Sequence, residues 1–539
     1  MTGKNLVLEA MRNRKTERTP YVPFVGVHGA SLLGISAEEY LKSEELMLKG
    51  IEKAVELYQP DGLPVCFDLQ IEAEILGCRL IWAKENPPAV ATHVLQEKKL
   101  SELPAITDEL GRIPVVMNVT RTVTKRFPDT AFYGLITGPF TLALHLMGPE
   151  IFMDMYDKPD YVKEVMRFCT DVAKRMARYY IDAGVDIVAL VDPMTSQISP
   201  DAFREFVTQY CTEIFSSIRE GGKLSSFFVC GHAQKNVEAM CECRPDNVSI
   251  DENIPLDYVR DVARPQGVSF GGNMKLTTVM LFGEENDNIR HAAECIAIAG
   301  DTGFILAPGC DIPYAVPPKN IIAVSEMVKD EYKLKVAMSL VGTEKAMTTD
   351  LDLSEYGGSG KIKIDVITLD SEACAPCQYM VESVKKVLPE FEGVIDWKEH
   401  KIKSKEAIEL MTALNVKNIP TICIDGHIAF VSQIPTTDEL ASAIYKRMIE
   451  RARYRKSAAR ILLLTDDSPE SRAVKENIAK AQRELGTSIA VEEVRDKKKI
   501  EMEFGVKRLP AVITIQEELR SFGKVVDKDV IKEWIKSII

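Results

Sequence analysis

Two groups of cysteines in this sequence have the residue types and spacing to do chemistry. Cys374 and Cys377 are separated by two residues, a spacing typical of pairs that cycle between dithiol and disulfide. The second group is an apolar run that ends in Cys230 and His232, together with the distant Cys310. Because zinc in enzymes takes Cys and His ligands, this second group predicts metal or thiol chemistry.

The Cys374 pair opens a predicted helix, and the positive end of a helix dipole favours a thiolate there. We therefore expect Cys374 to be the attacking sulfur and Cys377 the resolving one. The alternative is half of a structural metal site, for which only Cys423 and His427 are near in sequence. The redox interpretation is favoured, because a structural site usually needs a second Cys or His pair nearby.

Length and composition limit the class of protein. At 539 residues the chain is too long for one hydrophobic core, so we predict several domains. A net charge of -13 argues against a nucleic-acid partner, which needs clustered Lys and Arg. No segment approaches the roughly 18 apolar residues of a membrane span, and no apolar secretory segment is visible. These features predict a cytoplasmic protein whose 12 cysteines are thiols, ligands or redox pairs.

The first 331 residues alternate short apolar runs with longer amphipathic ones, typical of parallel strands covered by helices. Helical periodicity is clear at 37–57, 158–183 and 200–220. Eight strand candidates predict an α/β fold, a (β/α)8 barrel over residues 1–341. The candidates are 21–27, 62–67, 132–137, 186–191, 226–230, 247–250, 268–271 and 304–307.

Barrel enzymes carry reactive groups at the C-terminal ends of their strands. Cys230 and Cys310 follow the fifth and eighth strand candidates, so both can converge on the barrel axis. The alternative is that free cysteines are buried as small apolar side chains, and that polar residues simply follow strands where the chain leaves the core. The other candidates at the barrel mouth, for substrate binding or as orienting groups, are His28, Asp68, Glu72, Asp192, Asp251 and Asn273.

The sequence after the barrel predicts two smaller α/β domains. Residues 342–360 are polar and Gly-rich, typical of a flexible linker. Residues 361–450 follow the order of a thioredoxin-like unit, with Pro420 where that fold carries a cis proline facing the dithiol. The same order recurs over 456–539, but Ser468 and Ser471 fall where the first copy has cysteines. The second copy is therefore interpreted as a degenerate scaffold or docking surface.

Several stretches of the barrel segment match a known family. They are 68–78, Thr137-Gly138-Pro139-Phe140-Thr141, Asp192-Pro193 with Ile198-Ser199-Pro200, Val229-Cys230-Gly231, Gly272-Asn273 and 304–313. On these stretches the segment resembles the uroporphyrinogen decarboxylase superfamily, and within it the methylcobalamin:coenzyme M methyltransferase branch. A true decarboxylase is disfavoured, because the first loop lacks the arginines of that enzyme and His28 is the only ionisable residue at 26–30.

The resemblance implies a (β/α)8 fold and a zinc ion held by a His-x-Cys pair and a distant Cys. Cys230 and Cys310 match the two cysteines, whereas Phe228 stands where the histidine is expected. Either His232 replaces it, with an Asp or Glu from a neighbouring loop, or zinc binding is altered or lost. A thiol bound to zinc is deprotonated, so it could attack the methyl group of a methylated corrinoid.

These features together predict a corrinoid-dependent methyltransferase. The methyl group would move between methylcobalamin, carried by a corrinoid protein, and a small thiol or similar acceptor. A thioredoxin-reductase-like protein is a possible partner of the redox module. A homo-oligomer is compatible with this prediction. Two alternatives remain open, a thiol-disulfide oxidoreductase that uses the barrel for binding, and a non-catalytic adaptor for a corrinoid protein.

Overall fold

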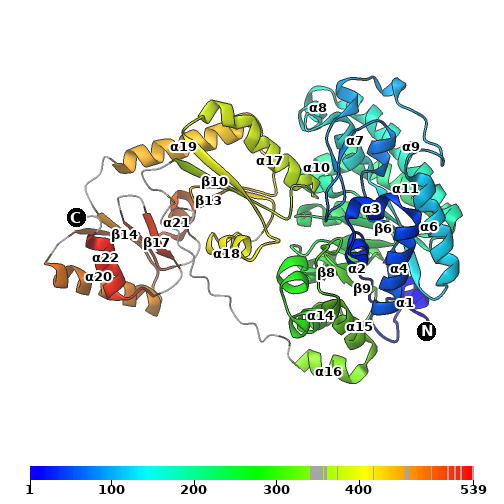
Figure 1. Cartoon of the computed structure of the whole chain (residues 1–539). Coiled ribbons are helices and arrows are strands. Elements are labelled where there is room, and N and C mark those ends of the chain that lie inside the picture. Colours follow the sequence, from blue (N-terminus) through cyan, green and yellow to red (C-terminus); the bar gives the residue numbers. More distant parts are fainter. Residues whose placement is uncertain are drawn as a thin grey trace. The chain divides into compact units, whose positions relative to one another are not determined.

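The computed structural model divides the chain into two compact units (Figure 1). One comprises Met1–Lys345 with Asp370–Gln378, and the other comprises Ala346–Leu369 with Tyr379–Ile539. The predicted linker at 342–360 lies outside the described residues except for Tyr356. The described residues are 1–339, 341, 356, 361–372, 374–416, 418–455, 460–486, 489–504, 506, 509–514, 518–522 and 525–536.

Seven parallel strands form the sheet of the barrel, in the order β1-β4-β5-β6-β7-β8-β9 (Figure 1). Each strand pairs with the next in sequence, because helices carry the chain back between parallel neighbours. The predicted α/β barrel is thus confirmed. The strands are β1 (Gly62–Pro64), β4 (Ala131–Thr137), β5 (Ile187–Val191), β6 (Leu224–Val229), β7 (Asn247–Ile250), β8 (Ser269–Met274) and β9 (Phe304–Pro308).

The first predicted strand, 21–27, is reduced to a single bridge. Tyr21 pairs in parallel with Leu306 of β9, and its carbonyl accepts a hydrogen bond of 3.0 Å from the Asp61 amide beside β1. Pro20 and Pro23 have no N–H to donate, so a continuous ladder cannot form there. This short segment connects the two edges of the seven-stranded sheet.

Amphipathic helices cover the outside of the sheet. The predicted helix at 37–57 is divided at Ser43, whose hydroxyl caps the second part by accepting from the Leu46 amide. Within the described ranges, no helix has the length and apolar character needed to cross a membrane. The longer helices are α4 (Glu44–Tyr58), α6 (Ile113–Arg126), α9 (Pro159–Ala183), α11 (Gln209–Glu220), α14 (Glu285–Ala299) and α15 (Pro318–Lys329).

Aromatic side chains fill the barrel interior. The Phe228 ring, at the end of β6, lies 5.2 Å from the ring of Phe24 and 5.9 Å from that of Phe67, measured between centroids. Cys230 and Cys310 pack against this cluster. The interior is therefore apolar directly below the two thiols.

Two four-stranded sheets follow the barrel, in the orders β11-β10-β12-β13 and β15-β14-β16-β17. In both, the first pair is parallel and the other pairs are antiparallel, so the predicted repeat has one shared topology. Pro420 and Pro510 both follow a cis peptide bond. The strands are β10 (Ile362–Thr368), β11 (Ile395–Lys401), β12 (Thr421–Ile424), β13 (His427–Val431), β14 (Arg460–Leu464), β15 (Ala490–Val494), β16 (Ala511–Thr514) and β17 (Glu518–Phe522).

Candidate active site

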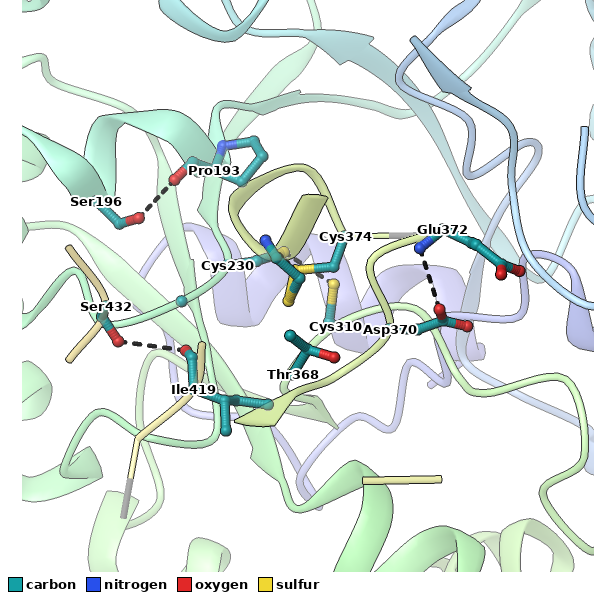
Figure 2. Close-up of a disulfide and its surroundings, with 12 residues drawn as sticks. Pro193, Ser196, Cys230, Cys310, Thr368, Asp370, Glu372, Cys374, Ile419 and Ser432 are labelled. Atoms are coloured by element: carbon teal, nitrogen blue, oxygen red, sulfur yellow. Dashed lines mark hydrogen bonds between the residues drawn. A yellow bond between two sulfur atoms is a disulfide. The ribbon is translucent and has the colours of Figure 1, made fainter. Parts of the chain in front are cut away.

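Cys230 and Cys310 meet at the C-terminal ends of β6 and β9, with their sulfur atoms 2.8 Å apart (Figure 2). A hydrogen bond with Cys310, together with burial, raises the pKa of the Cys230 thiol well above its ordinary value. Gly309 lets the chain before Cys310 pass close to the loop after β7, because a Cβ at that position would lie 2.5 Å from the Glu252 amide nitrogen. The structure thus brings together two free thiols that are 80 residues apart in sequence.

Two acidic residues, Asp251 and Glu252, follow β7. They lie beside Gly231 and Gly309, the residues next to the two thiols. Asp251 accepts hydrogen bonds from the amides of Gly231, at 2.8 Å, and Asn253, at 2.9 Å. Burial raises the pKa of Asp251, and burial together with the Asp251 charge raises the pKa of Glu252 to about 8. Glu252 therefore keeps its proton at neutral pH. The sequence shows only that Glu252 follows a predicted strand. Its closeness to Gly309 in the structure is what places it in the site.

Asn273, at the end of β8, holds the loop that carries these acids. Its side-chain amide donates to the backbone carbonyls of Asp251, at 3.1 Å, and Ile254, at 2.7 Å. Its NH2 group is therefore used within the protein. In this structure Asn273 orients the acidic loop.

The donor set at the two thiols does not fit the zinc site that the resemblance implies. Among the residues that the structure describes, no three His, Cys, Asp or Glu side chains are arranged to hold a metal ion. Phe228 occupies the expected histidine position and packs into the barrel core. We therefore assign no chemical step to zinc.

His232, the proposed replacement ligand, is half-buried. Its Nδ1 atom is buried and has no hydrogen-bond partner. Burial lowers the pKa of His232, while the negative charge of Asp251 opposes that shift. His232 therefore lies in the electrostatic range of the acidic loop without completing a three-ligand group with the thiols.

His28 is fully committed to structural hydrogen bonds. Its Nδ1 lies 3.0 Å from the Tyr314 carbonyl oxygen, and its Nε2 lies 2.7 Å from the Tyr58 hydroxyl. Because a carbonyl only accepts, Nδ1 carries the proton and Nε2 accepts from Tyr58. Burial lowers the pKa of His28 to about 4, so the ring is neutral. Neither ring nitrogen is left for a substrate in this structure.

Asp68 forms a buried ion pair. It accepts a hydrogen bond of 2.6 Å from Arg112 Nη1, and Arg112 Nε donates to Glu74 at 2.8 Å. The Asp68 side chain is completely buried, and that of Arg112 is 9% exposed. Arg112 Nη2 is buried and has no hydrogen-bond partner among the described residues.

Replacing Asp68 with alanine is expected to lower the free energy of unfolding by about 3 kcal/mol or more, because it leaves the Arg112 charge buried beside only Glu74. Urea unfolding of the barrel checks this. Glu45→Ala is the matched control, since it breaks an exposed ion pair with Lys49 and should change stability little. Equal effects of the two substitutions would contradict the role assigned to Asp68.

Glu72 and Asp192 are buried carboxyls that brace neighbouring strand ends. Glu72 accepts from the amide and hydroxyl of Thr137, at 2.9 and 2.8 Å. Asp192 accepts from the amides of Phe140 and Thr141 in the first turn of α7 (Pro139–Met147). Burial raises the pKa of Glu72 to about 7 and that of Asp192 to about 6.

The raised pKa of Glu72 predicts a pH-dependent stability. Between the ordinary value of 4.5 and about 7, the folded protein binds a proton at Glu72 that the unfolded chain has released. This group should therefore lower stability as pH rises through that window, by up to about 3 kcal/mol. Glu72→Gln should remove this part of the slope while Asp192 continues to titrate. Urea unfolding at pH 5 and 7.5 checks it, and an unchanged slope would contradict the shift.

The Cys374–Cys377 pair forms a disulfide at the start of α17 (Ala375–Val387). The Cys374 amide donates to the Asp370 carbonyl at 2.9 Å, and the Cys377 amide donates to Cys374 Sγ at 3.4 Å. In the second repeat, Ser468 instead caps α20 (Pro469–Leu485) through the Ser471 amide. The helix N-terminus therefore carries two sulfur atoms in the first repeat. The corresponding helix N-terminus of the second repeat carries two hydroxyls.

A parallel barrel that carries paired thiols at its strand ends, followed by thioredoxin-like sheets, defines the class of this chain. It belongs to the uroporphyrinogen decarboxylase (URO-D) family, whose model matches residues 2–331. A thioredoxin-domain model matches residues 460–536, within the repeat that lacks the cysteine pair.

Relatives of the barrel include methyltransferases. The methylcobamide:CoM methyltransferase MtbA of Methanosarcina acetivorans is 22% identical over 338 residues, covering 61% of this chain and 98% of the relative. MtaA of Methanosarcina barkeri, with the same printed activity, is 27% identical over 350 residues with the same coverage. A solved methyltransferase structure from Methanosarcina mazei is 25% identical with a TM-score of 0.57, covering 62% of this chain and 99% of that one.

Proposed function

We propose that the barrel transfers a methyl group between a methylated corrinoid, carried by a partner protein, and a small thiol or similar acceptor. The observation that carries this proposal is the pair of thiols, Cys230 and Cys310, which meet at the C-terminal ends of β6 and β9. The methylcobamide:CoM methyltransferases among the relatives support the same chemistry. In a barrel, these strand ends are the usual place for reaction.

The chain's own residues would bind the acceptor and manage its proton. Cys230 and Cys310 mark the position of the acceptor sulfur, above the apolar floor made by Phe228. The Asp251 carboxylate, which accepts a hydrogen bond from the Gly231 amide next to Cys230, would take up the proton that the acceptor releases on becoming a thiolate. The corrinoid supplies an electrophilic methyl group. Among the described residues, no third ligand joins Cys230 and Cys310, so the proposal does not rely on zinc.

Decarboxylation of a polycarboxylate tetrapyrrole fits the site less well. Such a substrate needs cationic side chains, and the first loop offers only His28, which is neutral and bonded on both nitrogens. Incubating the full chain separately with uroporphyrinogen and with a methylated corrinoid plus a thiol distinguishes the two reactions. We expect a methylated thiol and no decarboxylation, whereas decarboxylation without methyl transfer would overturn the proposal.

We propose thiol-disulfide exchange as a second activity, carried by the Cys374–Cys377 disulfide. Pro420 supports it, because its cis peptide bond is a feature expected of thioredoxin-like folds. A thioredoxin-reductase-like protein would return electrons to this pair, and the second repeat would serve as scaffold or docking surface. Binding of a corrinoid protein without either activity would favour the adaptor alternative.

A further inference from the structure

The segment that carries the Cys374–Cys377 pair belongs to the same compact unit as the barrel. Asn86, in the barrel segment of the chain, donates a hydrogen bond of 2.7 Å to Asp370 Oδ2. Gln378 Nε2 donates to the Val90 carbonyl at 2.8 Å. Figure 2 shows Cys230 and Cys310 among the surroundings of the Cys374–Cys377 disulfide. Four sulfur atoms from distant parts of the sequence are therefore gathered in one unit.

Asp370 links the barrel contact to the geometry of the cysteine pair. Its backbone carbonyl accepts from the Cys374 amide at 2.9 Å, and its Oδ1 accepts from the Glu372 amide at 3.0 Å. Its other carboxylate oxygen accepts from Asn86, and both side chains are buried. A hydrogen bond to a buried carboxylate is stronger than one between neutral groups. The Asn86–Asp370 contact therefore positions the start of the redox segment.

The barrel thiols are themselves arranged to form a disulfide. Their sulfurs are 2.8 Å apart, and a disulfide bond is about 2.05 Å long, so a small movement would join them. Such a bond would remove both thiols from the proposed acceptor site. A route for reducing it would restore that site.

We propose that the Cys374–Cys377 dithiol reduces a disulfide formed between Cys230 and Cys310 of the same chain. The Cys374 thiolate attacks one barrel sulfur, forming a mixed disulfide and breaking the barrel S–S bond, and the released sulfur takes up a proton. Cys377 then loses its proton and attacks Cys374, which releases the second barrel sulfur to take up that proton. Two electrons pass to the barrel pair, and Cys374–Cys377 becomes a disulfide, the bonding pattern of the structure.

The oxidant and reductant belong to common chemical classes. A low-molecular-weight disulfide oxidises Cys230 and Cys310, and an external dithiol reduces Cys374–Cys377 after each cycle. This inference deepens the proposed redox activity and rests on it, but it does not depend on methyl transfer. The assays below contain no methyl donor, so failure of methyl transfer would leave their outcome unaffected. Reduction of an external disulfide, measured separately, reports the redox activity itself.

The test traps the mixed disulfide in the full-length Cys377→Ser variant, in which the second step cannot occur. The protein is reduced, treated with oxidised glutathione and digested without reduction, and the peptide connectivity is read by mass spectrometry. We expect Cys374 joined to Cys230 or Cys310 within one chain, at a rate independent of protein concentration. The matched control, Cys377→Ser with Cys423→Ser, should give the same link, because Cys423 is buried in β12.

A second comparison tests the positioning contact. Asn86→Asp places a carboxylate beside Asp370 and should slow the link roughly tenfold, the effect of losing a charge-assisted hydrogen bond. Adding Asp370→Asn reverses the donor and acceptor and should restore the rate, which a merely destabilising substitution would not do. The proposal is overturned if Cys374 links only between chains or not at all, or if Cys230 and Cys310 resist oxidation. An unchanged rate in Asn86→Asp would remove the positioning role.

Discussion

Replacing Cys310 or Cys230 with serine is expected to lower corrinoid-dependent methyl transfer at least about a hundredfold, the scale at which positioned proton-handling and polar groups act in enzymes. Both sulfurs lie at one point of the barrel mouth, 2.8 Å apart, so each substitution changes the same acceptor position. The measurement is the initial rate of thiol methylation by reduced full-length protein.

The control for this result is another buried thiol of the same barrel. Cys169 is a buried residue of α9 and is not part of the thiol pair, so Cys169→Ser should retain the wild-type rate. Equal losses in the Cys169 variant would indicate general damage to the fold. Wild-type rates in both Cys230→Ser and Cys310→Ser would show that the thiol pair is not the methyl-transfer site.

Replacing Cys374 with serine is expected to abolish reduction of an external disulfide such as that of insulin, a loss of at least about a thousandfold. The attacking group in disulfide exchange is a thiolate, and serine supplies no equivalent nucleophile at neutral pH. Cys374 is the expected attacking sulfur because it precedes α17, where the Cys377 amide points to its Sγ.

Cys423→Ser is the matched control for the redox result, because Cys423 is fully buried in β12. Its variant should reduce insulin at the wild-type rate. Activity that survives in Cys374→Ser but disappears in Cys423→Ser would contradict the assignment of the attacking sulfur.

Periodicity in the sequence was sufficient to predict the barrel and the place of its thiols. An apolar run that ends in Cys230 identifies a strand end directly, and Cys310 follows another such run. Parallel strands bring these ends to one side of a barrel, so their proximity depends on topology alone. The extent of the first predicted strand, 21–27, was wrong, because only Tyr21 forms a bridge and Pro20 and Pro23 have no N–H to continue the ladder.

The roles of polar residues at the barrel mouth were harder to predict, because they depend on partners distant in sequence. The sequence predicts a binding role for His28, whereas Tyr58 and the Tyr314 carbonyl occupy its two ring nitrogens in the structure. Nothing in the sequence around Asn86 indicates a contact with Asp370, 284 residues later. Hydrogen-bond pairing of this kind is fixed by tertiary packing and leaves no local periodic pattern.

We propose above all that the two barrel thiols form a site for methyl transfer. The most direct measurement follows an isotopically labelled methyl group from methylcobalamin to a small thiol, using the reduced wild-type chain and the Cys230→Ser/Cys310→Ser double variant. We predict labelled thioether with the wild type and only the uncatalysed background with the double variant. No label transfer by the wild type, or equal transfer by both proteins, would contradict it.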